Sequence, residues 1–364
     1  MRHHWQKKPL LLRGAFRQLD HFIDLATLRT LALRDDVESR LIRRVGRRWQ
    51  VDHGPLEADD FDTLPSRNWT LLVQDVQHHL PAAWRLLREF NFIPDARLDD
   101  LMISYALDGG GVGPHFDSYD VFLIQARGRR AWRVASKFDR QIRRDVPLKM
   151  LHPFTAEHEW VLEPGDMLYL PPGVAHDGVA LDECITLSVG FRAPRSYELA
   201  LGFLQELGAA HDFGNMLRDP GLEATRNPAR LDAKLVARYR ALLGELDWRW
   251  AEFPDFLGRY LSEPKAHVEF EPPSSALTPR AFARAAERRL ALTRKTRMLY
   301  RNRQFYINGE ILRAQADRPA LRRLADQRCI SGYKWSATTM PTLYEWYLAG
   351  YVVATEFARE TSAR

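Results

Sequence analysis

Two histidines and one aspartate stand at a spacing that suits an iron centre. His115 and Asp117 form a His-x-Asp pair, and His176 follows the turn sequence Pro171–Gly173 much later in the chain. Two imidazoles and one carboxylate hold Fe(II) on one face and leave the opposite face open. Residues i and i+2 of a β-strand point to the same side, so a strand would aim His115 and Asp117 at one metal. The pattern therefore predicts an oxygenase.

The surrounding sequence favours this site over histidines that only satisfy hydrogen bonds in a core. Gly109–Pro114 is a sharp bend that delivers a strand, and Pro164–His176 resembles a jelly-roll turn that presents a histidine. His152 and His158 compete as the third ligand, but neither follows a proline-glycine turn. The H-E-x-x-H pattern of zinc hydrolases is absent from the sequence. The glycine run also lacks the Gly-Lys-Ser/Thr ending of a phosphate loop.

Short strands and tight turns are expected to position these residues. Residues 1–200 read as one mixed α+β domain, with a strand at 9–14, a helix at 20–34, a strand from Trp69 and a helix at 82–89. A dense series of short strands separated by glycine and proline predicts an antiparallel barrel or a double-stranded β-helix, the cupin-like jelly roll. The expected strands of that series are 101–107, 115–125, 128–136, 157–162, 167–170 and 185–191.

The second half of the chain has a different pattern. Helical periodicity covers 196–210 and 229–262, and a proline-rich linker follows at 264–279. A basic helix, a hairpin and two final helices resemble a winged helix-turn-helix. We therefore expect a helical domain at 201–265 and a winged-helix domain at 266–364. The elements expected in the winged helix are a helix at 280–292, strands at 298–300 and 304–307, and helices at 318–327 and 339–355.

Composition limits the classes of protein to which the chain can belong. It has 364 residues, of which 45% are hydrophobic and 27% charged, as in ordinary globular proteins. No apolar run approaches the roughly 18 residues of a membrane span. Only two cysteines occur, Cys184 and Cys329, so a disulfide framework is implausible and a reducing cytoplasm is expected. The net charge of +6 favours an acidic partner, and nine Lys or Arg face one acid between Arg280 and Arg303.

Five blocks of the sequence carry a family resemblance. They resemble the Jumonji-C ribosomal oxygenases, and more narrowly the bacterial branch that hydroxylates an arginine of the sixteenth large-subunit ribosomal protein. The resemblance is dense over the first 200 residues and looser afterwards, where that family carries a helical dimerisation domain and a winged helix. The chain starts nearer to the first block than family members do, which suggests a misassigned start or a missing peripheral helix. The blocks are His4–Pro9, Asp99–Tyr105, Gly109–Trp132, Pro164–His176 and Ser188–Pro194.

The resemblance implies a role for each residue of the site. His115, Asp117 and His176 match the catalytic iron ligands. Arg130 takes the place of the basic residue that binds 2-oxoglutarate, since a guanidinium can bond a carboxylate in bidentate fashion. Ser104 is the expected second contact to that carboxylate, with an ordinary strand serine as the alternative. The implied cofactors are Fe(II), 2-oxoglutarate and O2.

The resemblance also implies a partner, a large-subunit ribosomal protein, and a homodimer formed by the helices at 196–262. An acid near the iron would suit a cationic arginine, so Asp100 and Asp120 are candidate substrate contacts. Tyr119 and Arg192 are further candidates because they follow core strands. The apolar face of the helices has an alternative use, packing on the chain's own barrel.

Three other functions stay open at this point. The jelly roll could be a sensor in a nucleic-acid-binding regulator, with direct binding through the arginine-rich segment 280–303. A metal-binding cupin that works without 2-oxoglutarate is the second alternative. A ribosomal oxygenase that hydroxylates histidine is the third, since animal relatives modify that side chain.

Overall fold

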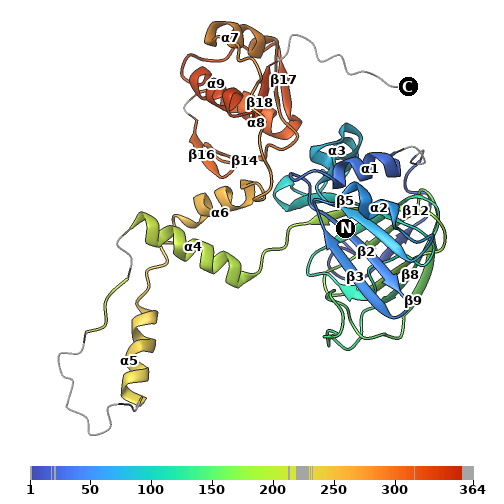
Figure 1. The fold of residues 1–364 in the computed structure, drawn as a ribbon. Coiled ribbons are helices and arrows are strands. Elements are labelled where there is room, and N and C mark those ends of the chain that lie inside the picture. Colours follow the sequence, from blue (N-terminus) through green and yellow to red (C-terminus); the bar gives the residue numbers. More distant parts are fainter. Residues whose placement is uncertain are drawn as a thin grey trace.

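A computed structural model shows a jelly-roll domain, a helical arm and a C-terminal α+β module (Figure 1). It describes residues 2–17, 19, 22–211, 214–218, 229, 231, 233–314 and 316–354. The end of the expected helix at 339–355 and parts of those at 20–34 and 229–262 fall outside these residues. Among the described helices, none is long and apolar enough to cross a bilayer.

Two antiparallel sheets form the jelly roll. The larger has the strand order β1-β10-β7-β12-β5-β4-β2-β3, and the smaller has the order β6-β11-β8-β9. Neighbours in each order are often far apart in sequence, as a jelly roll requires. The larger sheet consists of Leu10–Leu12, Met167–Leu170, Val121–Arg127, Cys184–Phe191, Leu98–Ala106, Trp69–Val73, Ser39–Val45 and Arg48–His53, in sheet order. The smaller consists of His115–Phe116, Ala175–Ala180, Arg130–Ala135 and His158–Leu162.

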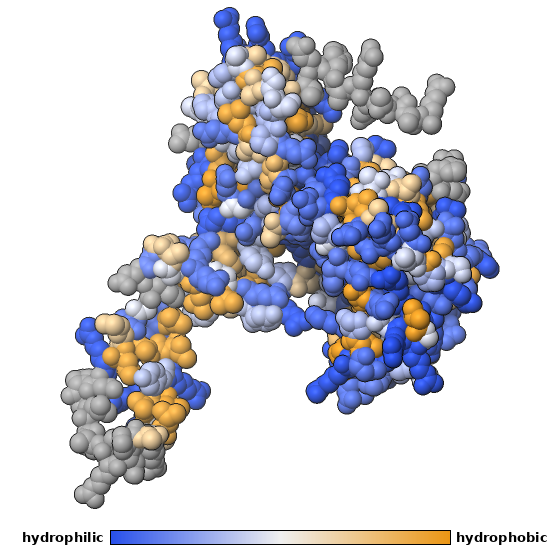
Figure 2. Space-filling view, in the orientation of Figure 1, coloured by the Kyte–Doolittle hydropathy of each residue, from blue (hydrophilic) through white to orange (hydrophobic). Residues whose placement is uncertain are grey.

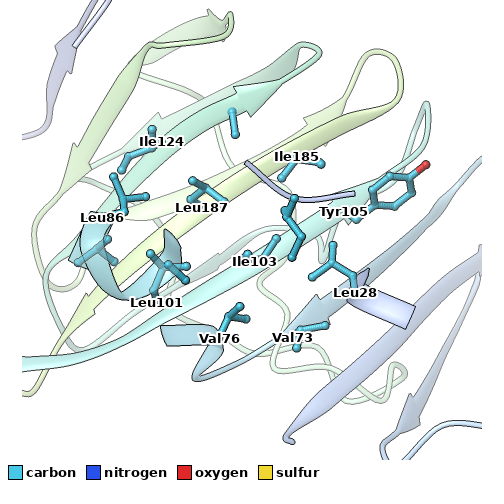
Figure 3. Close-up of a cluster of buried hydrophobic side chains, with 14 of the residues drawn as sticks. Leu28, Val73, Val76, Leu86, Leu101, Ile103, Tyr105, Ile124, Ile185 and Leu187 are labelled. Atoms are coloured by element: carbon cyan, nitrogen blue, oxygen red, sulfur yellow. The ribbon is translucent and has the colours of Figure 1, made fainter. Parts of the chain in front are cut away.

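Strand β5 shows how the larger sheet separates core from site. Successive side chains of a strand point to opposite faces, so one strand can serve both. One face of β5 joins the largest hydrophobic cluster with Leu101, Ile103 and Tyr105 (Figure 3). The other face lines a cavity with Asp100, Met102 and Ser104.

Helices cover the outer face of the larger sheet. Helix α1 (Leu25–Ala32) begins where the Asp24 carboxylate accepts a hydrogen bond from the Thr27 amide. Helix α3 (Pro81–Arg88) has proline at its first position, where no amide hydrogen is needed. Leu28 and Leu86 from these helices enter the same cluster as the strand residues (Figure 3). A short helix, α2 (Ala58–Asp62), adds Phe61.

Three helices link the jelly roll to the C-terminal module. Helix α4 (Ser196–Ala210) packs against α6 (Phe253–Ser262) through Phe203, Leu207 and Phe256. Helix α5 (Ala233–Gly244) extends away from the rest of the chain and buries none of its residues (Figure 1).

The C-terminal module has its own core. Its helices are α7 (Pro279–Arg288), α8 (Arg318–Gln327) and α9 (Met340–Leu348). One sheet orders β17 (Cys329–Ser331), β13 (Arg289–Leu292) and β18 (Val352–Ala354), and the other orders β14 (Met298–Arg301), β15 (Gln304–Ile307) and β16 (Glu310–Arg313). Phe282, Leu324 and Trp346 belong to one buried cluster that is separate from the jelly-roll core.

Part of the arginine-rich segment is used in contacts between the two units. Arg297 donates to the carbonyls of Leu98 and Asp99 at 3.0 and 2.8 Å, and Arg294 donates to the carbonyl of His78 at 3.2 Å. These side chains tie the C-terminal module to the jelly roll. They are therefore less available for an acidic partner than the sequence indicates.

Several expected elements differ from those in the structure. The single strand expected at 115–125 is two strands, β6 and β7, which belong to different sheets and are joined by a turn. The helix expected at 229–262 is split into α5 and α6, and α6 restarts at Phe253-Pro254 because proline suits a first turn. The helix expected at 280–292 ends at Arg288 and continues as β13. The last expected helix ends at Leu348, before Gly350 with its positive φ of 76°.

Candidate active site

His115, Asp117 and His176 come together at the open end of the smaller sheet. Strand β6 carries His115 and pairs antiparallel with β11, so that His115 lies directly opposite His176. Asp117 follows β6 immediately, and its carboxylate lies 3.6 Å from Nε2 of His176. One potential ligand atom from each residue lies within 4.8 Å of the others. Within the described part of the chain, no other group of three His, Cys, Asp or Glu side chains meets this criterion.

Backbone carbonyls orient both imidazoles. Nδ1 of His115 lies 2.9 Å from the carbonyl of Gly113, and Nδ1 of His176 lies 3.1 Å from that of Val174. A carbonyl can only accept, so each Nδ1 carries the proton and each Nε2 keeps its lone pair. This is the arrangement of a metal-binding histidine whose second nitrogen is fixed by the protein.

Burial keeps His176 neutral. Its side chain is 3% exposed, and this burial, with the imidazole of His115 close by, lowers its pKa to about 4. A histidine must be neutral to donate a lone pair to a metal. His176 therefore has the protonation state of a ligand at neutral pH.

The three residues open into a cavity of about 270 Å³ between the two sheets. Alternate residues of β5, β12 and β8 form much of its wall, which follows from the period of two in strands. Arg40 and Lys149 add positive charge to the lining. The lining residues from the three strands are Asp100, Met102, Ser104, Thr186, Ser188, Gly190, Arg130 and Trp132.

Arg130 and Ser104 meet in this cavity. Arg130 is 5% exposed, and its Nη2 donates to Oγ of Ser104 at 3.1 Å. Its Nε is buried without a hydrogen-bond partner, and no carboxylate of the described residues lies within 4 Å of the guanidinium. A buried charge without a counter-ion is costly. This donor set therefore fits an anionic ligand in the cavity.

The neighbouring arginines are engaged elsewhere. Arg129 pairs with Asp182 at 2.9 Å, and Arg133 pairs with Glu159 at 3.3 Å, both with side chains more than 40% exposed. Both pairs lie outside the cavity lining. Of the arginines in this strand region, Arg130 alone faces the cavity.

The candidate substrate contacts fall into two groups. Asp100 and Tyr119 line the cavity beside Gly190, where a Cβ would stand 3.1 Å from the Asp100 carboxylate. Asp120 is fully buried outside the lining and accepts hydrogen bonds from Tyr169 at 2.6 Å and Gln6 at 2.9 Å. The structure therefore assigns Asp120 a structural position, and the expectation that it contacts substrate is wrong.

Arg192 also lies outside the cavity. It donates to the carbonyls of Leu261 and Glu263 at 3.0 and 3.2 Å, and it lies 3.5 Å from Asp99. These contacts make it part of the junction between the jelly roll and the C-terminal half.

Trp132 and Lys149 line the cavity but were not singled out from the sequence. Trp132 has a buried Nε1 without a partner, and its ring lies 6.0 Å from that of His176. Gly178 makes room for it, because a Cβ there would stand 2.6 Å from the indole. The strand period offered a signal, since Trp132 is two residues from Arg130 on β8. Nothing local marks Lys149, which lies in a loop.

The two histidines that competed for the third ligand position lie elsewhere. His158 stacks on Trp160 at 4.8 Å in the edge strand β9, with its side chain exposed. His152 is exposed in the loop that precedes β9. Neither lines the cavity.

Comparisons with known proteins agree with this arrangement. Residues 85–199 match the JmjC domain family, and residues 245–352 match the ROXA-like winged helix family. The ribosomal protein uL16 3-hydroxylase of Escherichia coli is 39% identical over 328 residues, covering 88% of this chain and 86% of the relative. A probable ribosomal oxygenase of Haemophilus influenzae is 38% identical over 56% of this chain and 51% of its own length.

A solved structure shows the same fold. The ribosomal oxygenase YcfD of Escherichia coli, in complex with cobalt and 2-oxoglutarate, superposes with a TM-score of 0.82 and 35% identity. The superposition covers 97% of this chain and 96% of that one. The likeness therefore extends over the jelly roll, the helices and the C-terminal module.

Proposed function

The chain belongs to the JmjC ribosomal oxygenases, and we propose that it is an Fe(II)- and 2-oxoglutarate-dependent hydroxylase of the ribosomal protein uL16. The observation that carries the proposal is one cavity that holds both the His115–Asp117–His176 trio and the unpaired buried guanidinium of Arg130. The trio alone fits a metal. The trio with a buried cation fits a metal and an anionic cosubstrate together.

The residues of the site have separate proposed roles. His115, Asp117 and His176 are the proposed iron ligands, and Arg130 with Ser104 is the proposed anchor for the distal carboxylate of 2-oxoglutarate. Held there, iron and 2-oxoglutarate would supply, with O2, the oxidising chemistry, in which 2-oxoglutarate would be converted to succinate and CO2. The protein orients the reactants, and its apolar walls at Val121, Leu123 and Trp132 exclude water from them.

Charge in the cavity favours an arginine side chain as the target. Asp100 is 8% exposed and lines the cavity together with the ring of Tyr119. A carboxylate receives a guanidinium through bidentate hydrogen bonds, and an aromatic face stacks on it. A neutral histidine would bring no positive charge to this buried acid. We therefore propose hydroxylation of arginine over hydroxylation of histidine.

The nucleic-acid regulator is less well supported. In a helix-turn-helix a short turn joins two helices and the second helix reads the groove of DNA, whereas here strand β17 lies between α8 and α9. Helix α9 carries Glu345 and no Lys or Arg. The metal-binding cupin alternative leaves the buried charge of Arg130 unexplained.

Mass spectrometry tests the function directly. Purified protein incubated with recombinant uL16, Fe(II), 2-oxoglutarate and O2 is expected to add the mass of one oxygen to uL16. Fragmentation is expected to place that oxygen on an arginine side chain. The reaction should stop when 2-oxoglutarate is left out.

Two results would redirect the proposal. Oxygen found on a histidine would mean that the protein is a histidyl hydroxylase. Oxidation that continues without 2-oxoglutarate would favour the cupin alternative.

We also propose that the protein forms a homodimer, and the exposed apolar face of α5 supports this proposal. Val236, Tyr239 and Leu243 are 55%, 52% and 69% exposed, and their spacing places them on one side of the helix. Figure 2 shows hydrophobic residues gathered on α5, away from the rest of the chain. A helix that exposes such a face in a monomer is expected to bury it against a partner. A second copy is the proposed partner, because an interface built by one face on itself closes with twofold symmetry.

Aspartate in place of Leu243 is expected to convert the dimer into a monomer. A charge at the centre of an apolar interface is left without a partner when two copies meet. Light scattering after size-exclusion chromatography measures the change in mass. Leu348→Asp is the matched control, since Leu348 is 40% exposed on α9 and lies outside the proposed interface. A wild-type monomer, or a Leu243→Asp dimer, would contradict the proposal.

Two smaller parts of the proposal concern compartment and domain limits. Cys184 and Cys329 are both free thiols, and a ribosomal protein substrate fits a cytoplasmic enzyme. We also propose to divide the chain near residues 200 and 265. Supporting this division, the jelly-roll core and the C-terminal core are separate clusters.

A further inference from the structure

Lys265 brings a positive charge from outside the jelly roll to the edge of the cavity. It lies after α6, beyond the residues that match the JmjC domain. Its ammonium is 3.1 Å from a carboxylate oxygen of Asp75, 3.5 Å from Asp99 and 3.8 Å from Asp100. Three carboxylates of the jelly roll therefore surround one cation of the C-terminal half.

The shortest of these contacts, between Lys265 and Asp75, is linked by hydrogen bonds to β5, the strand that carries Asp100. Asp75 is 2% exposed, and Gln77 donates to its carboxylate at 3.0 Å. The other end of the Gln77 amide accepts a hydrogen bond at 2.8 Å from the amide of Leu101, the residue after Asp100 on β5. His267, two residues after Lys265, contacts Asp75 at 3.1 Å. These contacts hold Lys265 in a fixed position relative to β5.

Asp99 and Asp100 differ in their counter-charges. Asp99 lies within 4 Å of Arg192 and Arg297 as well as Lys265. Asp100 points into the cavity, and among the described residues Lys265 is its one cation within 4 Å. The charge on Asp100 therefore depends on Lys265.

The electrostatics of the cluster agree with this dependence. Burial raises the pKa of Asp100 to about 7, while the charge of Lys265 opposes that rise. Burial also opposes the charge of Lys265, but Asp100 and Asp75 raise the pKa of the ammonium above its usual range. The remaining titratable or charged groups near Asp100 or in the cavity are Asp75, Asp99, Tyr119, Arg40, Lys149, Arg130 and the trio His115, Asp117 and His176.

We propose that Lys265 is a positioning residue for substrate binding. It holds the Asp100 carboxylate charged and in place to receive the guanidinium of the target arginine. The proposal rests on the proposed function, because it takes Asp100 as the acid that binds arginine. It makes the C-terminal half a contributor to the specificity of the active site. The metal and 2-oxoglutarate ends of the cavity do not involve Lys265.

Steady-state kinetics of the full chain with recombinant uL16 test the proposal. Lys265→Met is expected to raise KM for uL16 about fivefold at neutral pH, because a rise of one unit in the pKa of Asp100 from about 7 lowers its ionised fraction from about one half to about one tenth. The value of kcat and the KM for 2-oxoglutarate should change less than about twofold, since neither depends on Asp100. Lys265→Arg should keep most of the wild-type KM because it keeps the charge.

The pH dependence separates this role from a loss of packing. As pH rises past the higher pKa that Asp100 has in Lys265→Met, the carboxyl ionises without Lys265, so the defect of this variant is expected to shrink. Lys295→Met is the matched control. Lys295 also joins the two halves, because its ammonium lies 4.0 Å from the carboxylate of Asp36 in the jelly-roll half, but it does not contact Asp100. Its KM for uL16 should stay close to wild type.

Each outcome decides the matter. Equal defects in the Lys265→Met and Lys295→Met variants, or a Lys265→Met defect that does not change with pH, would overturn the proposal. An unchanged KM in Lys265→Met would overturn it as well. If Lys265→Met is too unstable to measure, Lys265→Gln carries the same expectation. A wild-type enzyme that does not oxidise uL16 would instead refute the proposed function.

Discussion

Alanine at His115 or at Asp117 is expected to abolish succinate formation while the protein keeps its fold. Each substitution removes one of three donor atoms that lie within 4.8 Å of one another. Loss of even a hydrogen-bond partner of a metal ligand costs about 10- to 100-fold in metal affinity or activity, so loss of the ligand itself should exceed about 100-fold. Succinate release and divalent-metal titration, measured on the same preparations, give the two readouts.

The fold should tolerate these changes. Neither His115 nor Asp117 is fully buried, and neither belongs to a hydrophobic cluster. Thermal denaturation of the metal-free variants should therefore match that of the metal-free wild type. The wild type should gain stability from metal by linkage, and the variants should not.

His158→Ala is the matched control for this prediction. His158 was a rival ligand in the sequence, yet it stacks on Trp160 away from the cavity. We expect it to retain metal binding and activity. Full activity in His115→Ala, or loss of metal binding in His158→Ala, would refute the assignment of the ligands.

The trio and its anchor were predictable because short sequence patterns specify them. His115 and Asp117 are two residues apart, and the proline-glycine turn before His176 marks the start of a strand. Arg130 and Ser104 came from family resemblance, and the hydrogen bond between them joins β8 and β5, which belong to different sheets. Local sequence patterns and the family resemblance therefore predicted most residues of the site.

Contacts that depend on packing between distant segments could not be predicted from the sequence. Lys265 and Asp75 are 190 residues apart, and nothing in the linker indicates that its lysine turns back to the jelly roll. The same holds for Arg294 and Arg297, which looked like a nucleic-acid surface and proved to join the two halves. Charge counts along a chain do not show which charges fold inward.

The prediction of one strand failed where the chain passes from one sheet to the other. Residues 115–125 looked continuous, but the chain leaves the smaller sheet after Phe116 and enters the larger sheet at Val121. The turn between them contains Asp117, so the proposed ligand lies where the sheets separate. Strands β2 and β3 were missed because arginines and other polar residues interrupt their apolar residues.

Methionine in place of Arg130 is expected to weaken 2-oxoglutarate binding without unfolding the protein. Hydrogen bonds to a charged group contribute about 1.5–3 kcal/mol, which corresponds to a rise in KM for 2-oxoglutarate on the order of 10- to 100-fold. The free protein should not lose stability, because removal of a buried charge that lacks a counter-ion relieves a desolvation cost. Thermal denaturation with and without 2-oxoglutarate, in the presence of cobalt, separates the two effects.

Two further variants test whether Arg130 acts as an anchor. Arg129→Met removes the neighbouring guanidinium, which pairs with Asp182 at the surface, and should leave KM for 2-oxoglutarate unchanged. Ser104→Ala should raise KM less than Arg130→Met, since it removes a neutral hydroxyl. If Arg130 and Ser104 hold the same carboxylate, their effects in the double variant should fall short of the sum. An unchanged KM in Arg130→Met would mean that another cation lining the cavity, Arg40 or Lys149, binds the carboxylate.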